Sequence, residues 1–391
     1  MRLSYCTNVH PAEDLEGVIR QLDEYSGPAR IAAGLDVLGV GLWLPAELAA
    51  LLASDDDALA SLRDALERNR LELRTINAFP FAAFHAEVVK LDVYRPNWAD
   101  AARLRFTLDC ALVLSRLLPP HADGSISTLP LGWRTEWSAD DDRIATAQLG
   151  ELSRELAALR HSSGHAIRLA IEPEPGCILD TVSDIVRWLA PRVADGAIDP
   201  EFIGVCLDTC HLAVSFAEPE SAVRQIAEAG LRVVKVQASA ALEVPDPADP
   251  LQRAAVGVFA EKRYLHQVRE LQPDGTVLAS DDLDEALEAL PATGPWRVHF
   301  HVPLHHVPAE PLRSTTDVLI RAVAAVAATP GGGDTHLDVE TYTWSVLPEG
   351  RNPADLVAGI AAELRWAVRE LVPPTADAAT HPKAQTEGAL R

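Results

Sequence analysis

The sequence predicts an α/β protein built as a (β/α)8 TIM barrel, with an inserted hairpin and helix segment before the last strands. Short apolar runs alternate with longer amphipathic stretches, as in repeated βα units around a parallel sheet. Four of the apolar runs end in acidic residues or histidines: LAIEPEPG, GVCLDTCH, VHFHVPLHH and LDVETYTW. Because the strands of such a barrel deliver their C-terminal residues to one mouth, we expect a polar centre there.

The N-terminal half supplies four predicted βα units. LSYCTN, RIAAGLDVLGVGLWL, LELRTINAFPF and GSISTLPLGW have the apolar, β-branched character of strands. The second is a strand or a pair of strands, and the third leads into an aromatic, proline-containing loop. Apolar residues recur at helical spacing over 11–25, 46–70, 98–118 and 140–161. Ser54 and Asp55 form a candidate internal cap in the second helix.

The C-terminal half continues the repeat and then interrupts it. IRLAIEPEPG, FIGVCLDTCH and LRVVKVQASAA follow one another, with helices predicted at 181–193 and 221–229 between them. Residues 242–294 break the pattern with the proline-rich EVPDPADP, a PDG turn typical of a hairpin and the helical DDLDEALEAL. We interpret this segment as an insertion over the barrel mouth. WRVHFHVPLH and HLDVETYTW resume strand character around a helix at 315–328.

These strand candidates number nine, one more than a barrel needs, so either GLDVLGVGL or VHFHVP is expected to lie outside the barrel. We expect a single domain over 1–372. Residues 373–391 are polar and predict a disordered tail.

Composition excludes several classes of function. The 391 residues carry a net charge of −23, which repels nucleic-acid phosphate and argues against a nucleic-acid partner. The N-terminus lacks the features of a signal peptide, and charges interrupt every apolar run before membrane-spanning length. Five scattered cysteines do not resemble a disulfide framework. We therefore expect a cytoplasmic protein without a membrane span; a homodimer is compatible with the sequence.

Glu172 and Glu174 are the first candidate site residues. Strand periodicity places both on one face, where two carboxylates repel each other unless a cation or a proton lies between them. The alternative is that one caps a helix and the other is solvated.

Asp208 and His211 form a more specific pair. Asp208 follows an apolar strand, where a buried carboxylate needs a cation, an arginine or a hydrogen-bond network. His211 comes three residues later, within reach of the same cavity. A helix N-cap is the alternative role for Asp208.

Two further runs present polar residues on one strand face. In VVKVQASAA these include Lys235 and Gln237; Lys235 is either a catalytic amine or the partner of the excess carboxylates. In VHFHVP they are His299 and His301, which could bind a metal, hold a metal-binding residue in position or lie on the surface.

Glu340 ends the last predicted strand and is followed by Tyr342 and Trp344 at the same parity. An acid beside aromatic rings is typical of a carbohydrate or polyol pocket, and a buried glutamate paired with an arginine is the alternative. His10 and Asn77 could add polar groups to the same mouth.

The order LAIEPEP, LDTCH, a strand about two dozen residues later and an acidic final strand resembles the xylose isomerase-like TIM barrel superfamily. Its epimerase-like members hold a divalent metal with a Glu, an Asp, a His and a Glu, and show D-x-x-H after the Asp. Glu172, Asp208 with His211, and Glu340 match these positions. Gln237 stands where the His is expected, so either Gln237 binds the metal, or His301 replaces the His, or the metal site is degenerate.

A larger set of phrases resembles the EboE-type metabolite traffic proteins. These are LSYCTNVHP, TINAFPF, STLPLGW, IEPEPGC, CLDTCH, KVQAS, RYLHQ, HFHVPLH and ETYTW, spread over 1–348. This resemblance implies a step on a small polyhydroxylated metabolite, a sugar or cyclitol, in secondary metabolism.

The leading hypothesis from these observations is a metal-dependent isomerase or epimerase that uses Mn²⁺, Mg²⁺, Zn²⁺ or Co²⁺. Its catalytic residues would be Glu172 and Glu340. Its metal ligands would be Glu172, Asp208, His301 and Glu340. Substrate would contact His10, Asn77, Glu174, His211, Lys235, Gln237, His299 and Trp344. The competing hypotheses are a non-catalytic metabolite carrier with a degenerate metal site and a metal-dependent hydrolase of the endonuclease-like branch.

Overall fold

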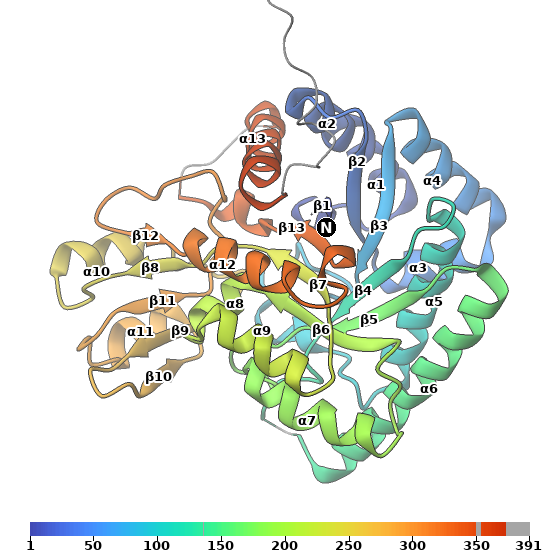
Figure 1. The fold of residues 1–391 in the computed structure, drawn as a ribbon. Coiled ribbons are helices and arrows are strands. Elements are labelled where there is room, and N and C mark those ends of the chain that lie inside the picture. Colours follow the sequence, from blue (N-terminus) through green and yellow to red (C-terminus); the bar gives the residue numbers. More distant parts are fainter. Residues whose placement is uncertain (136, 349–352, 373–391) are drawn as a thin grey trace, which may run out of the picture.

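Eight parallel strands close into a barrel with helices around its outside (Figure 1), which confirms the predicted (β/α)8 TIM barrel. The computed structural model describes residues 1–135, 137–348 and 353–372. Around the barrel the strands follow the order β1-β13-β7-β6-β5-β4-β3-β2. Their bounds are β1 Arg2–Cys6, β2 Leu38–Trp43, β3 Leu71–Asn77, β4 Gly124–Thr128, β5 Ile167–Ile171, β6 Ile203–Asp208, β7 Val233–Ala238 and β13 His336–Val339.

The barrel interior holds a buried ion pair. The Lys235 ammonium lies 2.9 Å from the Asp338 carboxylate, and both side chains are fully buried. Ser4 donates a 2.7 Å hydrogen bond to Asp338, and Ser127 accepts one of 3.2 Å from Lys235. Gly41 in β2 makes room for this pair, because a Cβ there would lie 2.3 Å from a carboxylate oxygen of Asp338.

The helix predicted over 46–70 is two helices, α3 Ala46–Ser54 and α4 Asp56–Arg68. Asp55 lies between them and accepts hydrogen bonds from the first backbone N–H groups of α4, so the predicted internal cap is confirmed. The helix predicted over 11–25 is instead α1 Leu15–Gln21, a π-helical turn and α2 Gly27–Ala33.

The remaining helices of the βα units agree with the prediction. They are α5 Ala101–Leu117, α6 Ala139–Ser163, α7 Val182–Ala194, α9 Pro219–Glu228 and α12 Thr316–Ala327. Three further helices were not predicted: α8 Thr209–Val214, α10 Pro250–Gly257 and α13 Pro353–Leu371.

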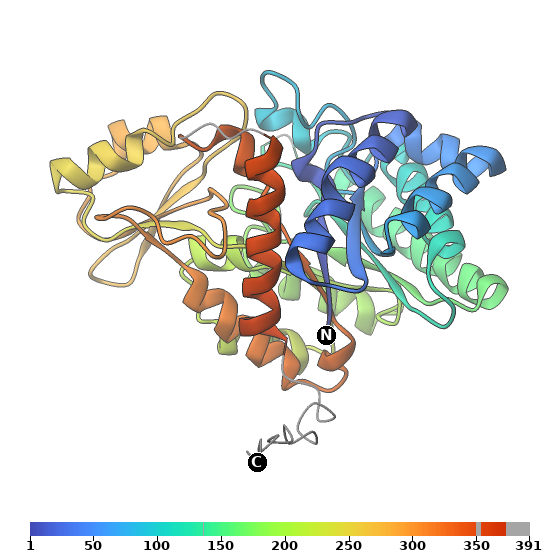
Figure 2. The ribbon, with the colours of Figure 1, turned by 90° about the horizontal axis from the view of Figure 1, so that it is seen from above.

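The insertion forms an antiparallel sheet beside the barrel (Figures 1 and 2). Its order is β10-β9-β11-β8-β12. The strands are β8 Leu242–Val244, β9 Val268–Leu271, β10 Val277–Ser280, β11 Trp296–Val298 and β12 Arg313–Ser314, and α11 Leu283–Ala289 lies between β10 and β11. The predicted PDG hairpin joins β9 to β10.

VHFHVP is therefore the run outside the barrel, and GLDVLGVGL supplies β2. Only the first residue of VHFHVP, Val298, belongs to β11, which pairs with β8 and β9 of the inserted sheet. The inserted sheet extends to Ser314, past the predicted end of the insertion at 294. His299 and His301 follow β11 and so reach the barrel mouth from the insertion.

Helix α13 packs against α2 and ties two site loops together (Figure 2). Its buried Glu363 accepts hydrogen bonds from the Leu304 N–H at 2.9 Å, the Thr341 hydroxyl at 2.7 Å and the Trp344 indole N–H at 3.3 Å. Leu304 lies three residues after His301, and Thr341 directly follows Glu340. One carboxylate thus fixes both segments.

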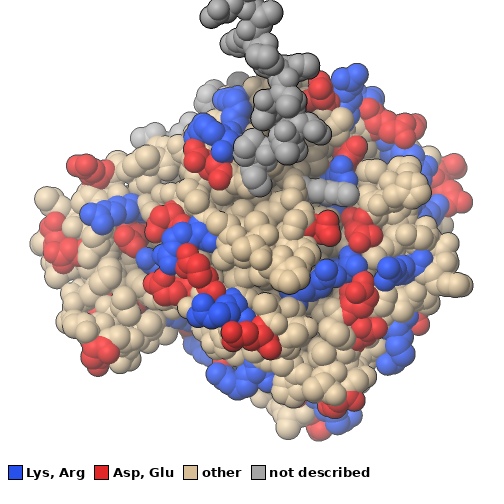
Figure 3. Space-filling model, viewed as in Figure 1, with Lys and Arg blue, Asp and Glu red and all other residues tan. Residues whose placement is uncertain are grey.

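Among the described residues, no helix is long and apolar enough to cross a membrane. On the face shown in Figure 3, acidic and basic residues are interspersed without a broad patch of one sign. The predicted tail, 373–391, lies outside the residues that the structure describes. The single domain over 1–372 remains our proposal.

Replacing Lys235 with methionine should leave Asp338 as an uncompensated buried charge. We expect the free energy of unfolding to fall by about 3–5 kcal/mol, measured by chemical denaturation. Arg321→Met is the control, because Arg321 pairs with Glu218 and Glu220 at an exposed position and should contribute little. An equal, small loss in both variants would contradict a structural role for the Lys235 pair.

Candidate active site

A cavity of about 550 Å³ opens at the C-terminal ends of the barrel strands. Polar residues from the barrel and the insertion line one part of it: Asn8, Asn77, Glu172, Glu174, His211, His299, His301 and Glu340. Aromatic and aliphatic residues line the rest. The cavity therefore combines a polar part with an apolar part.

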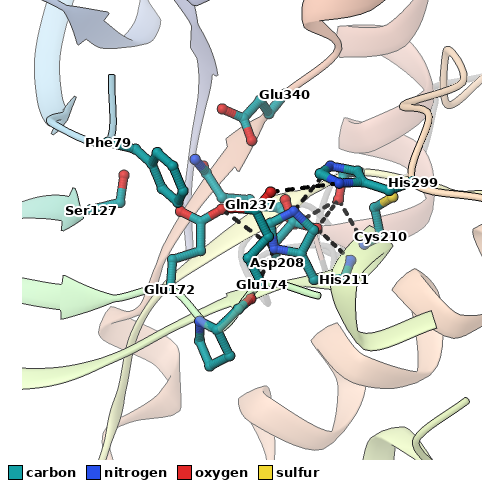
Figure 4. Close-up of polar contacts among 12 residues, drawn as sticks. Phe79, Ser127, Glu172, Glu174, Asp208, Cys210, His211, Gln237, His299 and Glu340 are labelled. Carbon is teal, nitrogen blue, oxygen red and sulfur yellow. Dashed lines mark hydrogen bonds and ion pairs between the residues drawn. The ribbon is translucent and has the colours of Figure 1, made fainter. Parts of the chain in front are cut away.

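Glu172, Asp208 and Glu340 bring three carboxylates together (Figure 4). They follow or end β5, β6 and β13, and one oxygen of each lies within 4.8 Å of the others. All three side chains are buried, and one oxygen of Glu172 (Oε2) and one of Asp208 (Oδ2) have no hydrogen-bond partner. Carboxylates this close repel one another unless protons or a cation offset their charge.

Burial and this repulsion both raise the pKa values of Glu172 and Glu340. Burial, followed by the charges of Glu340 and Asp208, raises the pKa of Glu172 well above its usual value. Burial and the charge of Asp208 raise the pKa of Glu340 to about 8. The positive charge of Lys235 lowers both pKa values and so offsets part of the effect.

Hydrogen bonds fix two of these carboxylates. Glu340 Oε1 accepts from the side-chain amides of Asn8 at 2.7 Å and Asn77 at 2.8 Å. Asp208 Oδ1 accepts from the Ser239 hydroxyl at 2.8 Å and the His211 N–H at 2.9 Å. Asp208 therefore does cap α8, the alternative role that its sequence context suggested, while its other oxygen still faces the cluster.

His301 presents a free nitrogen to the carboxylates. Its Nδ1 lies 2.7 Å from the Glu340 carbonyl oxygen, which can only accept, so Nδ1 carries the proton. Nε2 then has an unshared lone pair, has no hydrogen-bond partner, and lies 3.8 Å from Asp208 Oδ2. Burial lowers the pKa of His301 to about 4, so the imidazole is neutral at physiological pH.

His211 and His299 face each other through Nε2 at 3.1 Å. His211 Nδ1 donates to the Pro173 carbonyl at 2.9 Å, and His299 Nδ1 donates to Gln267 Oε1 at 2.6 Å. Both Nε2 atoms are therefore acceptors, and burial lowers the pKa of His299 well below its usual value, which disfavours a shared proton. A hydrogen-bond donor or a cation is needed to satisfy the pair. The Tyr342 hydroxyl lies 3.5 Å from His299 Nε2 and can donate to it.

Glu174 lies on the other side of His299. Its Oε1 accepts from the Tyr94 hydroxyl at 2.7 Å and from the Gln267 amide at 3.2 Å, whereas Oε2 has no partner. Burial raises the pKa of Glu174. Gln267 thus orients both His299 and Glu174.

Gln237 lies in β7, where it pairs with Asp208 of β6 and Asp338 of β13. Its side chain is buried, and neither its amide oxygen nor its amide nitrogen has a hydrogen-bond partner. Figure 4 shows it among the carboxylates.

Four predicted substrate contacts do not line the cavity. The first is Gln237, which lies among the carboxylates. Lys235 pairs with Asp338 inside the barrel. His10 lies 3.2 Å from the Tyr5 hydroxyl and packs against Tyr25. Trp344 packs against α13, with its indole nitrogen bonded to Glu363. For Lys235, His10 and Trp344, the strand face and the position near a strand end did not identify the residues that the side chain contacts.

The prediction lacked Tyr94 and Gln267, which position Glu174 and His299. Tyr94 lies in the aromatic loop after LELRTIN, and Gln267 lies in the RYLHQ run. Neither stretch has a spacing or motif that marks a site residue. Their roles depend on contacts between residues that are 32 to 173 positions apart in the sequence.

The donor set fits a divalent cation. Three carboxylates, one neutral imidazole and one amide oxygen are ligand types that divalent metals accept. The unpaired Glu172 Oε2, Asp208 Oδ2 and His301 Nε2 are buried atoms that a cation would satisfy. The residues present can therefore hold the metal that the sequence predicted.

The family model described as xylose isomerase-like TIM barrel matches residues 29–279 of the chain. No curated protein matches the chain.

Solved structures resemble the chain at low identity. The apo 3-keto-D-glucoside 4-epimerase from E. coli is 12% identical, with 94% of this chain and 99% of that chain covered and a TM-score of 0.46. D-allulose 3-epimerase from Methylomonas sp. is 14% identical, covering 61% and 72%, with a TM-score of 0.40. The IOLI protein with a bound zinc atom is 13% identical, covering 95% and 98%, with a TM-score of 0.46.

The raised pKa of Glu340 predicts how stability depends on pH after metal is removed with a chelator. The folded protein holds the proton up to about pH 8, whereas an unfolded glutamate releases it near 4.5. The contribution of Glu340 to the free energy of unfolding should therefore fall as pH rises from about 4.5 to about 8 and level off above that range, whereas buried histidines with a lowered pKa, such as His301, contribute in the opposite direction. Chemical denaturation across this pH range measures the effect.

Glu340→Gln should make this dependence shallower, because the amide does not titrate. Glu370→Gln, an exposed change on α13, should leave it unchanged. A difference in the free energy of unfolding between the wild-type protein and Glu340→Gln that stays constant over this pH range would contradict the raised pKa of Glu340.

Proposed function

Because the chain belongs to the xylose isomerase-like TIM barrel family, we propose that it is a metal-dependent isomerase or epimerase of a sugar or cyclitol. The observation that carries this proposal is the cluster of three buried carboxylates, one of which, Asp208, also lies 3.8 Å from the free Nε2 of the neutral His301. The resemblance to EboE-type metabolite traffic proteins supports a substrate from secondary metabolism and a cytoplasmic location.

The proposed metal ligands are Glu172, Asp208, His301 and Glu340. His301 supplies the imidazole that Gln237 cannot, and it reaches the centre from the inserted sheet. A divalent cation held there would polarise a carbonyl or hydroxyl oxygen of the substrate. The unpaired amide of Gln237 provides a further neutral donor beside these ligands.

Glu172 and Glu340 are the proposed proton carriers. One carboxylate takes the proton from the carbon next to the substrate carbonyl, and a proton returns to the opposite face of that carbon or to the neighbouring carbon. The first outcome is epimerisation and the second is isomerisation, and neither needs an external oxidant.

Glu174, His211 and His299 are the proposed contacts to substrate hydroxyls. Hydroxyl groups can donate to the two facing Nε2 atoms and to the unpaired oxygen of Glu174. Asn77 acts through Glu340, whose carboxylate it orients together with Asn8.

The carrier hypothesis rests on Gln237 at the expected His position, and it becomes the better account if no metal binds. The hydrolase hypothesis is weaker. Among the described residues lining the cavity, Lys90 is the sole Lys or Arg, and it pairs with Asp282, so a phosphodiester would have no unpaired cationic side chain to bind and would depend on the metal alone.

Metal content tests the ligand set. Protein purified without a metal-affinity column and incubated with Mn²⁺ or Zn²⁺ should hold near-stoichiometric metal by plasma mass spectrometry, and Asp208→Asn should lose it. Asp123→Asn is the matched control, because Asp123 pairs with Arg168 at the opposite end of the barrel. Metal that persists in Asp208→Asn would remove Asp208 from the ligand set.

Solvent exchange tests the reaction. Incubation of candidate sugars and cyclitol ketones with the metal-loaded enzyme in D₂O should place deuterium on the carbon next to the carbonyl, detected by mass spectrometry. Glu340→Gln should abolish turnover with the fold intact, while Asp123→Asn retains it. Turnover without deuterium incorporation would argue against proton transfer, and normal turnover in Glu340→Gln would remove Glu340 from the mechanism.

A further inference from the structure

The apolar part of the cavity is built by two segments that meet over the polar part. One is the loop after β3, residues 78–98, here called the aromatic loop; the other is residues 259–267 of the insertion. The backbone N–H groups of Val89 and Lys90 both donate to the Arg263 carbonyl, at 2.8 and 2.9 Å. The two segments therefore form one continuous wall.

Aromatic rings form the centre of this wall. Phe84 lies 5.2 Å from Tyr264 and 5.6 Å from Tyr342, and the last two rings are 4.9 Å apart, measured between ring centroids. Val93 and Leu265 extend the apolar lining of the cavity on either side. This surface faces the same cavity as the carboxylates.

The wall is held in place by contacts that do not involve a ligand. Buried Arg103 of α5 donates to the carbonyls of Ala78, Phe79 and Pro96, at 2.7, 3.1 and 2.9 Å. These bonds fix both ends of the aromatic loop. An apolar group can therefore bind to this preformed surface without the entropic cost of ordering the loop.

The charge of the cavity lining restricts which polar groups a substrate can carry. Its polar lining consists of glutamates, histidines and asparagines, and its one lysine, Lys90, pairs with Asp282. A phosphate group would bring further negative charge to a cavity that already holds Glu172, Glu174 and Glu340. The lining therefore disfavours a sugar phosphate.

We propose that the substrate is an uncharged polyol or sugar that carries an apolar substituent. The polyol end reaches the carboxylates and histidines, and the substituent lies against Phe84, Tyr264 and Tyr342. This inference rests on the proposed function, and it adds the chemical class of the substrate.

Hydroxamates test this proposal, because their paired oxygens bind a divalent metal independently of sugar stereochemistry. Acetohydroxamate, benzohydroxamate and 4-phosphonobenzohydroxamate would be titrated calorimetrically into the full chain loaded with Mn²⁺. Benzohydroxamate should bind at least about tenfold more tightly than acetohydroxamate, since burial of a phenyl ring contributes more than 1.4 kcal/mol. The phosphonate, which the rigid ring holds away from the metal, should remove that gain.

Substitutions in the wall test whether this surface causes the preference for benzohydroxamate. Phe84→Ala should lose most of the preference for benzohydroxamate, whereas Phe84→Leu, which stays apolar, should keep it. Leu265→Ser, at a partly exposed position, is a milder second variant if Phe84→Ala does not fold. Affinity for acetohydroxamate should remain unchanged in all three.

The outcomes separate this inference from the proposed function. Equal affinities for the two neutral hydroxamates, or tighter binding of the phosphonate, overturn the inference while the metal centre stands. If the protein holds no metal, the proposed function fails, and saturable binding of benzyl alcohol by ligand-observed NMR tests the wall alone. Loss of that binding in Phe84→Ala supports the apolar compartment; no binding to the wild-type protein overturns it.

Discussion

The structure is organised around the electrostatic cost of burying three carboxylates at one end of a barrel. Glu172, Asp208 and Glu340 lie within 4.8 Å of one another and are shielded from water, which would otherwise screen their repulsion. The surrounding groups reduce this cost without removing it. Asn8 and Asn77 donate to Glu340, Ser239 donates to Asp208, and Lys235 places a positive charge below the cluster. The unpaired oxygens that remain are the reason to expect a cation.

The barrel and the insertion contribute different parts of the site. Barrel strands supply the carboxylates, which must be held rigidly to stay so close together. The insertion supplies His299, His301, Gln267 and Tyr264, which complete the ligand set and form the wall of the cavity. Glu363 on α13 fixes the segments that carry Glu340 and His301 relative to each other. The site therefore depends on the insertion being docked on the barrel.

The sequence predicts the carboxylate positions well because one rule covers them. Parallel barrel strands end at the same mouth, so acidic residues at the ends of β5, β6 and β13 come together irrespective of the residues between them. His301 is harder to place because VHFHVP has the same alternation as a barrel strand, and β11 pairs with strands that are distant in sequence. For Lys235 the sequence left open a catalytic amine or a partner of the excess carboxylates; the structure shows a carboxylate partner, but Asp338 could not be identified as that partner without the register of β13 against β7. The same limitation applies to Trp344, whose partner lies on a helix that the sequence analysis did not predict.

The central claim is that Glu172, Asp208, His301 and Glu340 hold one divalent cation. The most direct test is an anomalous difference map from crystals soaked in Mn²⁺, collected near the manganese absorption edge. The account predicts one strong peak among the three carboxylates and His301 Nε2. A map without a peak at this position, or with its peak between His211 and His299 alone, would contradict the claim.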